Sequence, residues 1–320
     1  MGCGLGRGEP GWLIGEGGLT LTDSTLLRNT AAGNGGGILI LGDGVDFVPR
    51  VSLLRSVIQE NVSLAAEPGG GGGGVFAAGS LVATETVWRD NRAAEGDADG
   101  GGLLVTPGME ATLRDAEFTA NRAARDGGFT GASAGAVTIR RSRLEGNRAA
   151  VAGGGLSSEG GPVELRESTV SDNVTDGIGG GIGLASEGEM RLDRSTVSGN
   201  RATDGGGIAV SDQAAADLVL VTVSGNTAGH RGGGVLVDGG AVGLSSVTVT
   251  ANGASRGGGL LIESGSAETI NSVVAANSGL VGPDVGGPVS SRGHNLFGTR
   301  GFDFQVTLEP TDLVDVIRIE

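Results

Sequence analysis

Two carboxylates recur at matching places in the sequence and are its best candidates for catalysis. Asp238 and Glu263 each stand four residues after a run of three glycines, and His230 and Arg256 precede the same runs. If successive repeats stack as neighbouring strands, the two carboxylates would lie about 4.8 Å apart. Paired carboxylates are the groups with which enzymes cleave polysaccharides. Solvated acids on an acidic surface are the competing interpretation, and we expect no catalysis from this pair.

Arginine recurs in a second pattern, which indicates contact with anions. Arg114, Arg140 and Arg166 stand seven residues before an asparagine in three successive repeats. The residue before each is apolar, so these arginines are expected to face solvent. In register, their guanidinium groups would repeat about every 4.8 Å, close to the length of one sugar unit. An acidic polysaccharide is therefore the expected partner if the protein binds by charge, with another surface protein as the alternative.

Other charged residues also form columns when the repeats are aligned on asparagine. Glu164, Arg191 and Asp217 alternate in sign, which predicts ion pairs between neighbouring repeats. A further arginine column directly follows the asparagines: Arg92, Arg122, Arg148 and Arg201. Stacked like charges are unfavourable unless acids compensate them. The acids that we expect to compensate the arginines of both columns are Asp115, Glu145, Glu167 and Asp172.

Asparagine sets the period of the whole sequence, which is about 26 residues in its middle part. The recurring asparagines are Asn29, Asn61, Asn91, Asn121, Asn147, Asn173, Asn200, Asn226, Asn252 and Asn277. A glycine triplet keeps the same period and opens at Gly153, Gly179, Gly205, Gly232 and Gly257. One asparagine per repeat favours a turn, and stacked amides can hydrogen-bond one another along an axis. We therefore interpret Asn147, Asn173, Asn200, Asn226 and Asn252 as a structural column.

Apolar residues alternate around each asparagine and predict short strands with one buried face. Val197 and Leu192 stand three and eight residues before Asn200, and Ile208 and Val210 follow the next glycine triplet. A unit of this length with two or three short strands has no core of its own, but stacked units do. The sequence thus predicts an all-β parallel β-helix of about ten coils. Triple glycine argues against a helical solenoid.

Composition excludes several classes of protein. Of 320 residues, 66 are glycine, all 22 basic residues are arginine, and the net charge is −15. An acidic surface disfavours nucleic acid. The single cysteine, Cys3, excludes a disulfide framework and a cysteine-based zinc site, and we expect no metal and no cofactor. No apolar run is long enough to span a membrane.

The motifs resemble those of bacterial right-handed parallel β-helix surface proteins of the polymorphic outer-membrane-protein repeat type. In that family, Gly-Gly-aliphatic and hydrophobic-x-x-Asn motifs alternate, as in Gly205-Gly206-Gly207-Ile208 and Val223-Ser224-Gly225-Asn226. The end of the chain is similar to the last coil of large surface proteins of this kind. The segments that carry this similarity are Asn271-Ser272-Val273-Val274-Ala275-Ala276-Asn277, Gly282-Pro283-Asp284 and Gly293-His294-Asn295-Leu296. Val285 stands where such proteins often have a cysteine.

The resemblance implies an exported protein, secreted or at the cell surface, which acts as a passive scaffold or adhesin-like stalk. The resemblance identifies no catalytic residues, so we expect that this protein is not an enzyme. A carbohydrate-active β-helix enzyme is the alternative. We expect neither a signal peptide nor an anchor within this sequence, in contrast to the family. We expect one domain over 1–320, with 1–14 as an irregular start, 15–281 as repeats and 282–320 as a terminal coil and cap.

Overall fold

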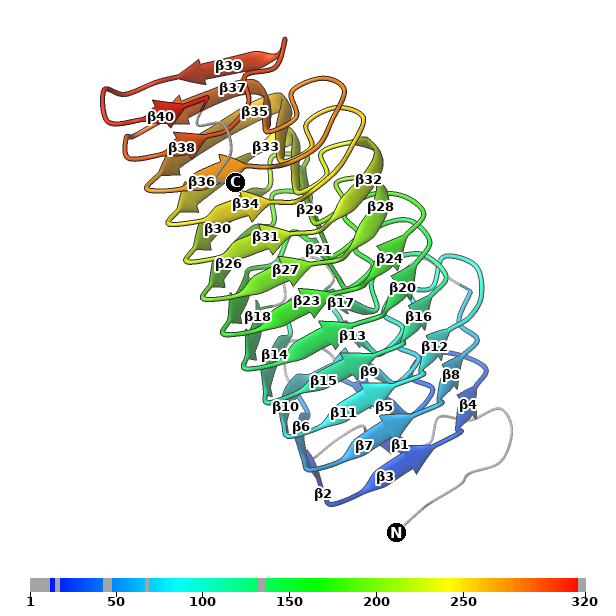
Figure 1. Ribbon diagram of the computed structural model, residues 1–320. Helices are drawn as coiled ribbons and strands as arrows, with labels where there is room; N and C mark the ends of the chain where they lie inside the picture. The colour runs from blue at the N-terminus through cyan, green and yellow to red at the C-terminus, as the bar shows by residue number, and fades with distance from the viewer. Residues whose placement is uncertain (1–11, 15–17, 43–47, 67–68, 132–135, 316–320) are drawn as a thin grey trace.

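The computed structural model describes residues 12–14, 18–42, 48–66, 69–131 and 136–315, and this part of the chain forms 40 strands and no helix. The strands wind into a rod of successive turns, each lying on the one before (Figure 1). Every pairing between strands is parallel, as in β27–β31, where Val197 lies beside Val223. The expected parallel β-helix is confirmed.

Each regular turn contains four strands rather than the two or three expected from the sequence. Between Asn200 and Asn226 the chain forms β28 (Arg201–Asp204), β29 (Ile208–Ser211), β30 (Ala215–Val219) and β31 (Thr222–Ser224). The strand that the sequence did not indicate is the short one directly after the asparagine, which is β28 in this turn. Ala202 is its only buried residue, so no apolar alternation marks it.

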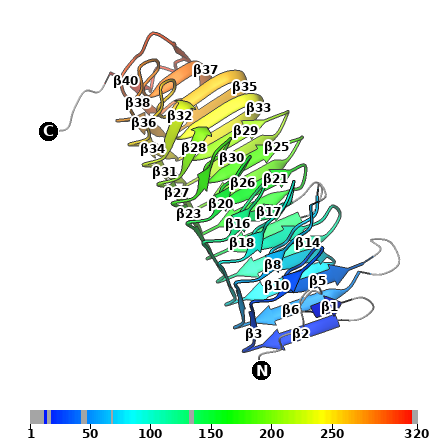
Figure 2. The same cartoon turned by 90° about the vertical axis from the view of Figure 1, so that its right-hand side faces the viewer.

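The strands form three sheets along the rod (Figure 2). The twelve-stranded and twenty-stranded sheets continue to its last turn, whereas the eight-stranded sheet ends at β32 (Thr227–Arg231). The twelve-stranded sheet contains β3 (Thr25–Leu27), β7 (Val57–Gln59), β11 (Val87–Arg89), β15 (Glu117–Thr119), β19 (Arg143–Glu145), β23 (Thr169–Ser171), β27 (Thr196–Ser198), β31, β34 (Thr248–Thr250), β36 (Val273–Ala275), β38 (Leu296–Phe297) and β40 (Leu313–Val314). The eight-stranded sheet contains β4 (Thr30–Ala31), β8 (Val62–Ser63), β12 (Arg92–Ala93), β16 (Arg122–Ala123), β20 (Arg148–Ala149), β24 (Val174–Thr175), β28 and β32 (Thr227–Arg231).

The twenty-stranded sheet carries two rows of strands that merge near the end of the rod. The first row is β1 (Trp12–Ile14), β5 (Ile38–Leu41), β9 (Val75–Ala78), β13 (Leu103–Val105), β17 (Phe129–Gly131), β21 (Leu156–Glu159), β25 (Ile182–Ala185) and β29. The second row is β2 (Gly18–Thr22), β6 (Arg50–Leu54), β10 (Ser80–Thr84), β14 (Glu110–Arg114), β18 (Ala136–Arg140), β22 (Val163–Arg166), β26 (Glu189–Asp193) and β30. The strands that join both rows are β33 (Val235–Ser245), β35 (Leu260–Ile270), β37 (Val285–Ser291) and β39 (Phe304–Thr307).

The core is a single apolar column inside the rod, built from the alternating positions predicted above. Val170, Val197 and Val223 lie in register and are 0% exposed. In an earlier part of the rod the column is wider, and the rings of Trp88 and Phe118 stack with centroids 4.5 Å apart. A buried aliphatic side chain contributes about 1.5–3 kcal/mol, so the repeated column supplies most of the stabilisation.

The asparagines form a continuous buried ladder along the rod. Asn200 donates its backbone N–H to Oδ1 of Asn226 at 3.0 Å and its side-chain amide to the same oxygen at 2.9 Å. Left-handed backbone falls on the residue before each asparagine, such as Gly199 at φ 67°, and not on the asparagine itself. At the end of the ladder Oδ1 of Asp284 replaces the next asparagine and accepts both N–H groups of Asn277.

The glycine triplets form the corner that leads into the twenty-stranded sheet. Gly205 has φ 64°, a conformation that side chains disfavour. Gly206 has a different constraint, because a Cβ there would lie 2.6 Å from the carbonyl oxygen of Gly233 in the next turn. The triplet is therefore a site of close backbone packing between turns and leads into a strand, as the sequence indicates.

The first turn begins earlier than the expected boundary at residue 15. Trp12–Ile14 form β1, which pairs in register with Ile38–Ile40 of β5. The irregular start assigned to 1–14 is wrong for these three residues, because their apolar side-chain types continue the pattern of Ile38 and Ile40. Residues 1–11 lie outside the described part of the chain. In the terminal segment 282–320, β37 to β40 add two further layers.

Candidate functional site

Asp238 and Glu263, the candidate catalytic pair, lie on adjacent turns but not opposite each other. Val237 pairs with Ile262, and the register then shifts, so that Asp238 lies opposite Ser264. The irregularity arises where β33 passes the corner through Gly239, at φ 91°. Ser264 donates its hydroxyl to Oδ1 of Asp238 at 3.0 Å.

Each of these two carboxylates is held by its own arginine. Nη1 of Arg231 lies 3.4 Å from Oδ2 of Asp238, and Nη1 of Arg256 lies 2.7 Å from Oε1 of Glu263. Arg231 also bonds Asp204 in the turn below, at 3.0 Å. The arrangement is a chain of ion pairs along one corner of the rod. His230 of β32, the other basic residue noted beside the pair, is exposed.

The arginine stripe predicted from the sequence exists as a row on β14, β18 and β22. Arg114 lies in register with Arg140, and Arg140 with Arg166. Glu164 lies beside this row, two residues before Arg166 on β22: its carboxylate is 3.4 Å from Nη2 of Arg140 and 2.5 Å from Nε of Arg166. The stripe is therefore partly neutralised by one acid from the same face of β22.

The acids expected to neutralise the stripe have other partners. Asp115 accepts two hydrogen bonds from Arg141, at 2.9 and 2.8 Å. Glu167 pairs with Arg194 at 3.4 Å, in the same manner one turn further along. Glu145 pairs with Arg143 at 3.2 Å. Among the described residues, direct ion pairs of these three acids with the stripe are therefore not formed, because other arginines are closer to them. Hydrogen bonding by Arg141 lowers the pKa of Asp115, and the charge of Arg114 still adds to this effect.

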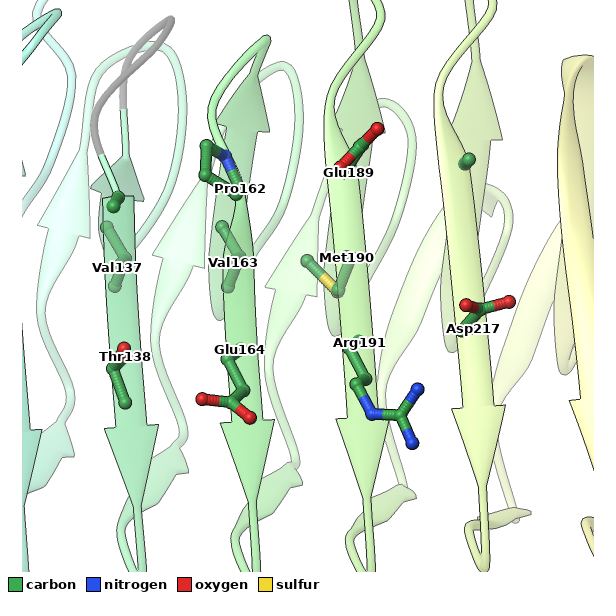
Figure 3. A pocket seen from close by; sticks show the side chains of 11 residues that line it. Val137, Thr138, Pro162, Val163, Glu164, Glu189, Met190, Arg191 and Asp217 are labelled. Carbon is green, nitrogen blue, oxygen red and sulfur yellow. The ribbon is translucent and has the colours of Figure 1, made fainter.

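One groove lies over β18, β22, β26 and β30, beside the stripe (Figure 3). Its volume is about 420 Å³, and small residues such as Ala136, Thr138 and Ala215 leave it open. The charged residues that line the groove are Glu164, Glu189, Arg191 and Asp217. It is a shallow surface hollow with acids on both sides of one arginine.

Glu164, Arg191 and Asp217 lie in register across this groove, but they do not form the ion pairs that their alternating signs predict. Within the described chain, no carboxylate oxygen lies within 4 Å of the Arg191 guanidinium. Glu164 is drawn to Arg140 and Arg166, while the Asp217 carboxylate lies over Gly243, 2.8 Å from where a Cβ would be. Arg191 is consequently exposed to solvent between two acids.

A second arginine row lies on the eight-stranded sheet. Arg92 of β12 is in register with Arg122 of β16, which is in register with Arg148 of β20. All three are exposed and line a groove of about 250 Å³ whose other residues are alanines. Arg201 of β28 lies in the same column but is separated from Arg148 by Val174. The sequence pattern placed these residues in one column without distinguishing them from the first stripe.

One cluster of buried acids was not singled out by the sequence pattern. Asp99 is 4% exposed and Asp126 is 3% exposed. Asp99 accepts the backbone N–H of Asp126 at 3.2 Å, and Nε of Arg125 lies 3.7 Å from Asp99 and 3.0 Å from Asp126. Arg125 also binds Glu159 at 3.2 Å. Burial raises the pKa of Asp99 to about 7 and raises that of Asp126, while the positive charge of Arg125 opposes both shifts.

The described residues offer neither a metal-binding cluster nor a membrane-spanning helix. They contain no group of three or more acids, histidines or cysteines arranged to hold a metal ion. They also contain no helix of the length and apolarity that a bilayer span requires. Cys3 lies outside the described residues.

Comparison with known families gives one match. A family model described as right handed beta helix region matches residues 86–278, more than half of the chain. No curated protein and no solved structure matches significantly. The matched segment includes the groove, both arginine rows and the Asp238–Glu263 corner.

Proposed function

The chain belongs to the right-handed β-helix family, and we propose that it is a non-catalytic member, a rigid scaffold that presents repetitive outer faces to a binding partner. The observation that supports this most is the state of the best carboxylate pair. Asp238 and Glu263 are out of register, and each has an oxygen bound by an arginine. A catalytic pair needs free oxygens that converge on one substrate bond.

We further propose a bacterial protein of the polymorphic outer-membrane-protein repeat type, secreted or displayed at the cell surface. The motifs that support this have definite structural roles. Gly206 lies at the close contact between turns, Asn226 in the buried ladder, and Asp284 at the end of that ladder. An acidic polysaccharide is the partner class that we propose for such a scaffold, because arginines repeat along its faces at the spacing of neighbouring strands.

A carbohydrate-active enzyme is the second candidate, and the groove over β18 to β30 is the observation that favours it. Glu164 and Asp217 lie two turns apart on either side of Arg191, so their strands are separated by about 10 Å. This is close to the separation of about 6.5–9.5 Å between the carboxyl groups of inverting glycosidases. Against an enzyme stands Glu164 itself, which is already bound by two arginines.

Incubation with polysaccharides tests the proposal. Wild-type protein is incubated with pectin, alginate and neutral glucans, with and without calcium, and new reducing ends and unsaturated products are measured. We expect neither. Turnover that is lost in Glu164→Gln or Asp217→Asn, or in Asp238→Asn, but kept in Glu117→Gln on another sheet, would establish an enzyme and overturn the proposal.

A further inference from the structure

We propose that Arg92 and Arg122, with Arg148 at one end, form a binding site for a linear polymer that carries carboxylate or sulfate groups, namely an acidic polysaccharide. The site lies on the eight-stranded sheet and not on the stripe of Arg114, Arg140 and Arg166. This inference rests on the proposed function, because it names the ligand class and the residues for one face of the scaffold.

The geometry of the row places three cations on one line. Arg92, Arg122 and Arg148 are in-register neighbours on β12, β16 and β20, so their Cα atoms repeat at about 4.8 Å. The next residue of each strand, such as Ala93 or Ala123, is buried. Because strand residues alternate between faces, the three guanidinium groups share the outer face.

Ion pairing distinguishes the members of the row. Arg148 is bound by Asp176 of the next turn, with both carboxylate oxygens 2.9 Å from Nη2. Asp176 stands three residues after the asparagine of its turn, and the equivalent residue is Ala150 beside Arg122 and Ala124 beside Arg92. Within the described chain, no carboxylate lies within 4 Å of the guanidinium groups of Arg92 and Arg122. Two stacked cations are therefore left with no acidic partner.

This state is unfavourable unless an external anion is bound. Like charges opposite one another on neighbouring strands repel. On the first stripe, by contrast, Glu164 lies between Arg140 and Arg166 and pairs with both, and Asp193 lies 3.9 Å from Arg166. An arginine can hold a carboxylate or a sulfate with two parallel hydrogen bonds, which makes such groups the natural ligands of Arg92 and Arg122.

The surroundings favour a flexible, extended ligand without aromatic groups. The groove along the row has a volume of about 250 Å³ and is lined by the three arginines and six alanines. Small side chains let a polymer approach the guanidinium groups closely. Single-stranded nucleic acids need aromatic side chains on which the bases stack, and this groove contains none. The strand spacing of about 4.8 Å suits a polymer with about one charged sugar per turn of the rod.

The net charge of −15 sets the expected strength of binding. A polyanion is repelled by the acidic surface outside the row, so the interaction is weak and sensitive to salt. Binding is therefore measured at low ionic strength. The probes are polygalacturonate and dextran sulfate, with neutral dextran and a single-stranded oligothymidylate for comparison.

The first pair of variants separates the two arginine rows. Arg92→Ser/Arg122→Ser is expected to weaken binding of both charged probes at least about tenfold. Arg114→Ser/Arg140→Ser/Arg166→Ser is the control, and it is expected to bind within about twofold of wild type. Because the control removes three positive charges and the test variant removes two, non-specific attraction would give the opposite order. Arg92 and Arg122, which the test variant replaces, are exposed. Circular dichroism verifies that both variants are folded.

The second pair of variants changes the row without removing an arginine. Ala124→Asp/Ala150→Asp places acids where Asp176 lies relative to Arg148, and is expected to weaken binding to the level of the double arginine variant. Asp176→Asn frees Arg148 and is expected to strengthen binding by a few-fold. Weaker binding when acids are added at Ala124 and Ala150, together with stronger binding when the acid at Asp176 is removed, is expected only if the polymer binds this row.

The remaining outcomes decide against the inference. Full binding by Arg92→Ser/Arg122→Ser, an equal loss in the triple variant, or tighter binding of oligothymidylate than of the polysaccharides would each overturn it. No binding of either charged probe by wild type would also overturn it, and the proposed scaffold function would still stand. Depolymerisation of a bound probe would instead overturn the proposed function and leave the binding site in place.

Discussion

Oδ1 of Asn226 accepts two hydrogen bonds from Asn200, one from the backbone at 3.0 Å and one from the side-chain amide at 2.9 Å. The same amide of Asn200 also reaches the carbonyl oxygen of Val170 in the turn below, at 3.0 Å. Each asparagine thus connects three successive turns, and both residues are buried. The ladder satisfies buried backbone groups at the corner between the twelve-stranded and the eight-stranded sheets.

Asn200→Ala is expected to destabilise the protein by about 2 kcal/mol or more. The change removes the acceptor of the backbone and side-chain N–H groups of Asn173, both buried, and each unsatisfied group costs about 1–3 kcal/mol. Denaturant unfolding measures the difference. Ser198→Ala, on the outer side of the same turn, is the control and is expected to stay within about 0.5 kcal/mol. An unfolding free energy equal to that of wild type would exclude a structural role for Asn200.

Gly206→Ala adds only one methyl group, but it is expected to destabilise the protein more than the size of that group suggests. Its Cβ would lie 2.6 Å from the carbonyl oxygen of Gly233 and 2.6 Å from the carbonyl carbon of Thr227, so the turns must separate locally. Overpacking of this kind costs about 1–3 kcal/mol or more. Gly229→Ala is the matched control, because its nearest neighbour, the oxygen of Thr203, is 3.6 Å away. Similar melting temperatures for the two variants would contradict the packing explanation.

The course of the backbone was largely predictable from the sequence. Asparagine, glycine and alternating apolar residues repeat with one period, and a slip of one residue would expose a whole apolar column. Val197 beside Val223 follows directly from that period. The fourth strand of each turn was not predictable in the same way, because the short segment after the asparagine, such as β24, contains only one buried residue and shows no apolar alternation.

The ion pairs on the surface were much less predictable, because a long charged side chain can pair with any of several neighbours at similar distances. Glu164 binds Arg140 and Arg166, although its in-register neighbour is Arg191. One bulge beside Asp238 was enough to separate it from Glu263. The difference within the second arginine row, between Arg148 and its neighbours Arg92 and Arg122, does have a sequence feature. An acid or an alanine occupies the third position after the asparagine, but the importance of that position is evident only once Asp176 is seen to bind Arg148.

Glu164→Gln is expected to destabilise the rod slightly, by about 0.5–1 kcal/mol at low salt. Without this carboxylate the stacked Arg140 and Arg166 repel each other, since the nearest remaining acid, Asp193, is 3.9 Å from Arg166. The effect is expected to shrink in about 1 M salt, where the Debye length falls to about 3 Å. Glu189→Gln in the same groove is the control. Unfolding curves of the two variants at low and high salt measure the change in stability. An identical dependence on salt in both variants would contradict the proposed role of Glu164.

The pH dependence of stability is expected to report on Asp99. Its pKa is raised by burial to about 7, from an ordinary value of 3.8, with Arg125 opposing the shift and the charges of Asp126 and Glu159 adding to it. Between these two values the native state therefore binds more protons at Asp99 than the unfolded chain does. Stability contributed by this group is complete below about pH 4 and is lost as the pH rises to about 7.

Asp99→Asn keeps a neutral oxygen acceptor for the N–H of Asp126 and removes the charge. It is expected to be more stable than wild type at pH 8, by on the order of a few kcal/mol, and to show little advantage near pH 4. Arg125 keeps Asp126 and Glu159 as partners in this variant. Asp97→Asn, an exposed acid on the same loop, is the control and should parallel wild type at every pH. Thermal unfolding from pH 4 to pH 8 measures the slopes, and parallel curves for Asp99→Asn and wild type would show that Asp99 is already ionised in the folded protein.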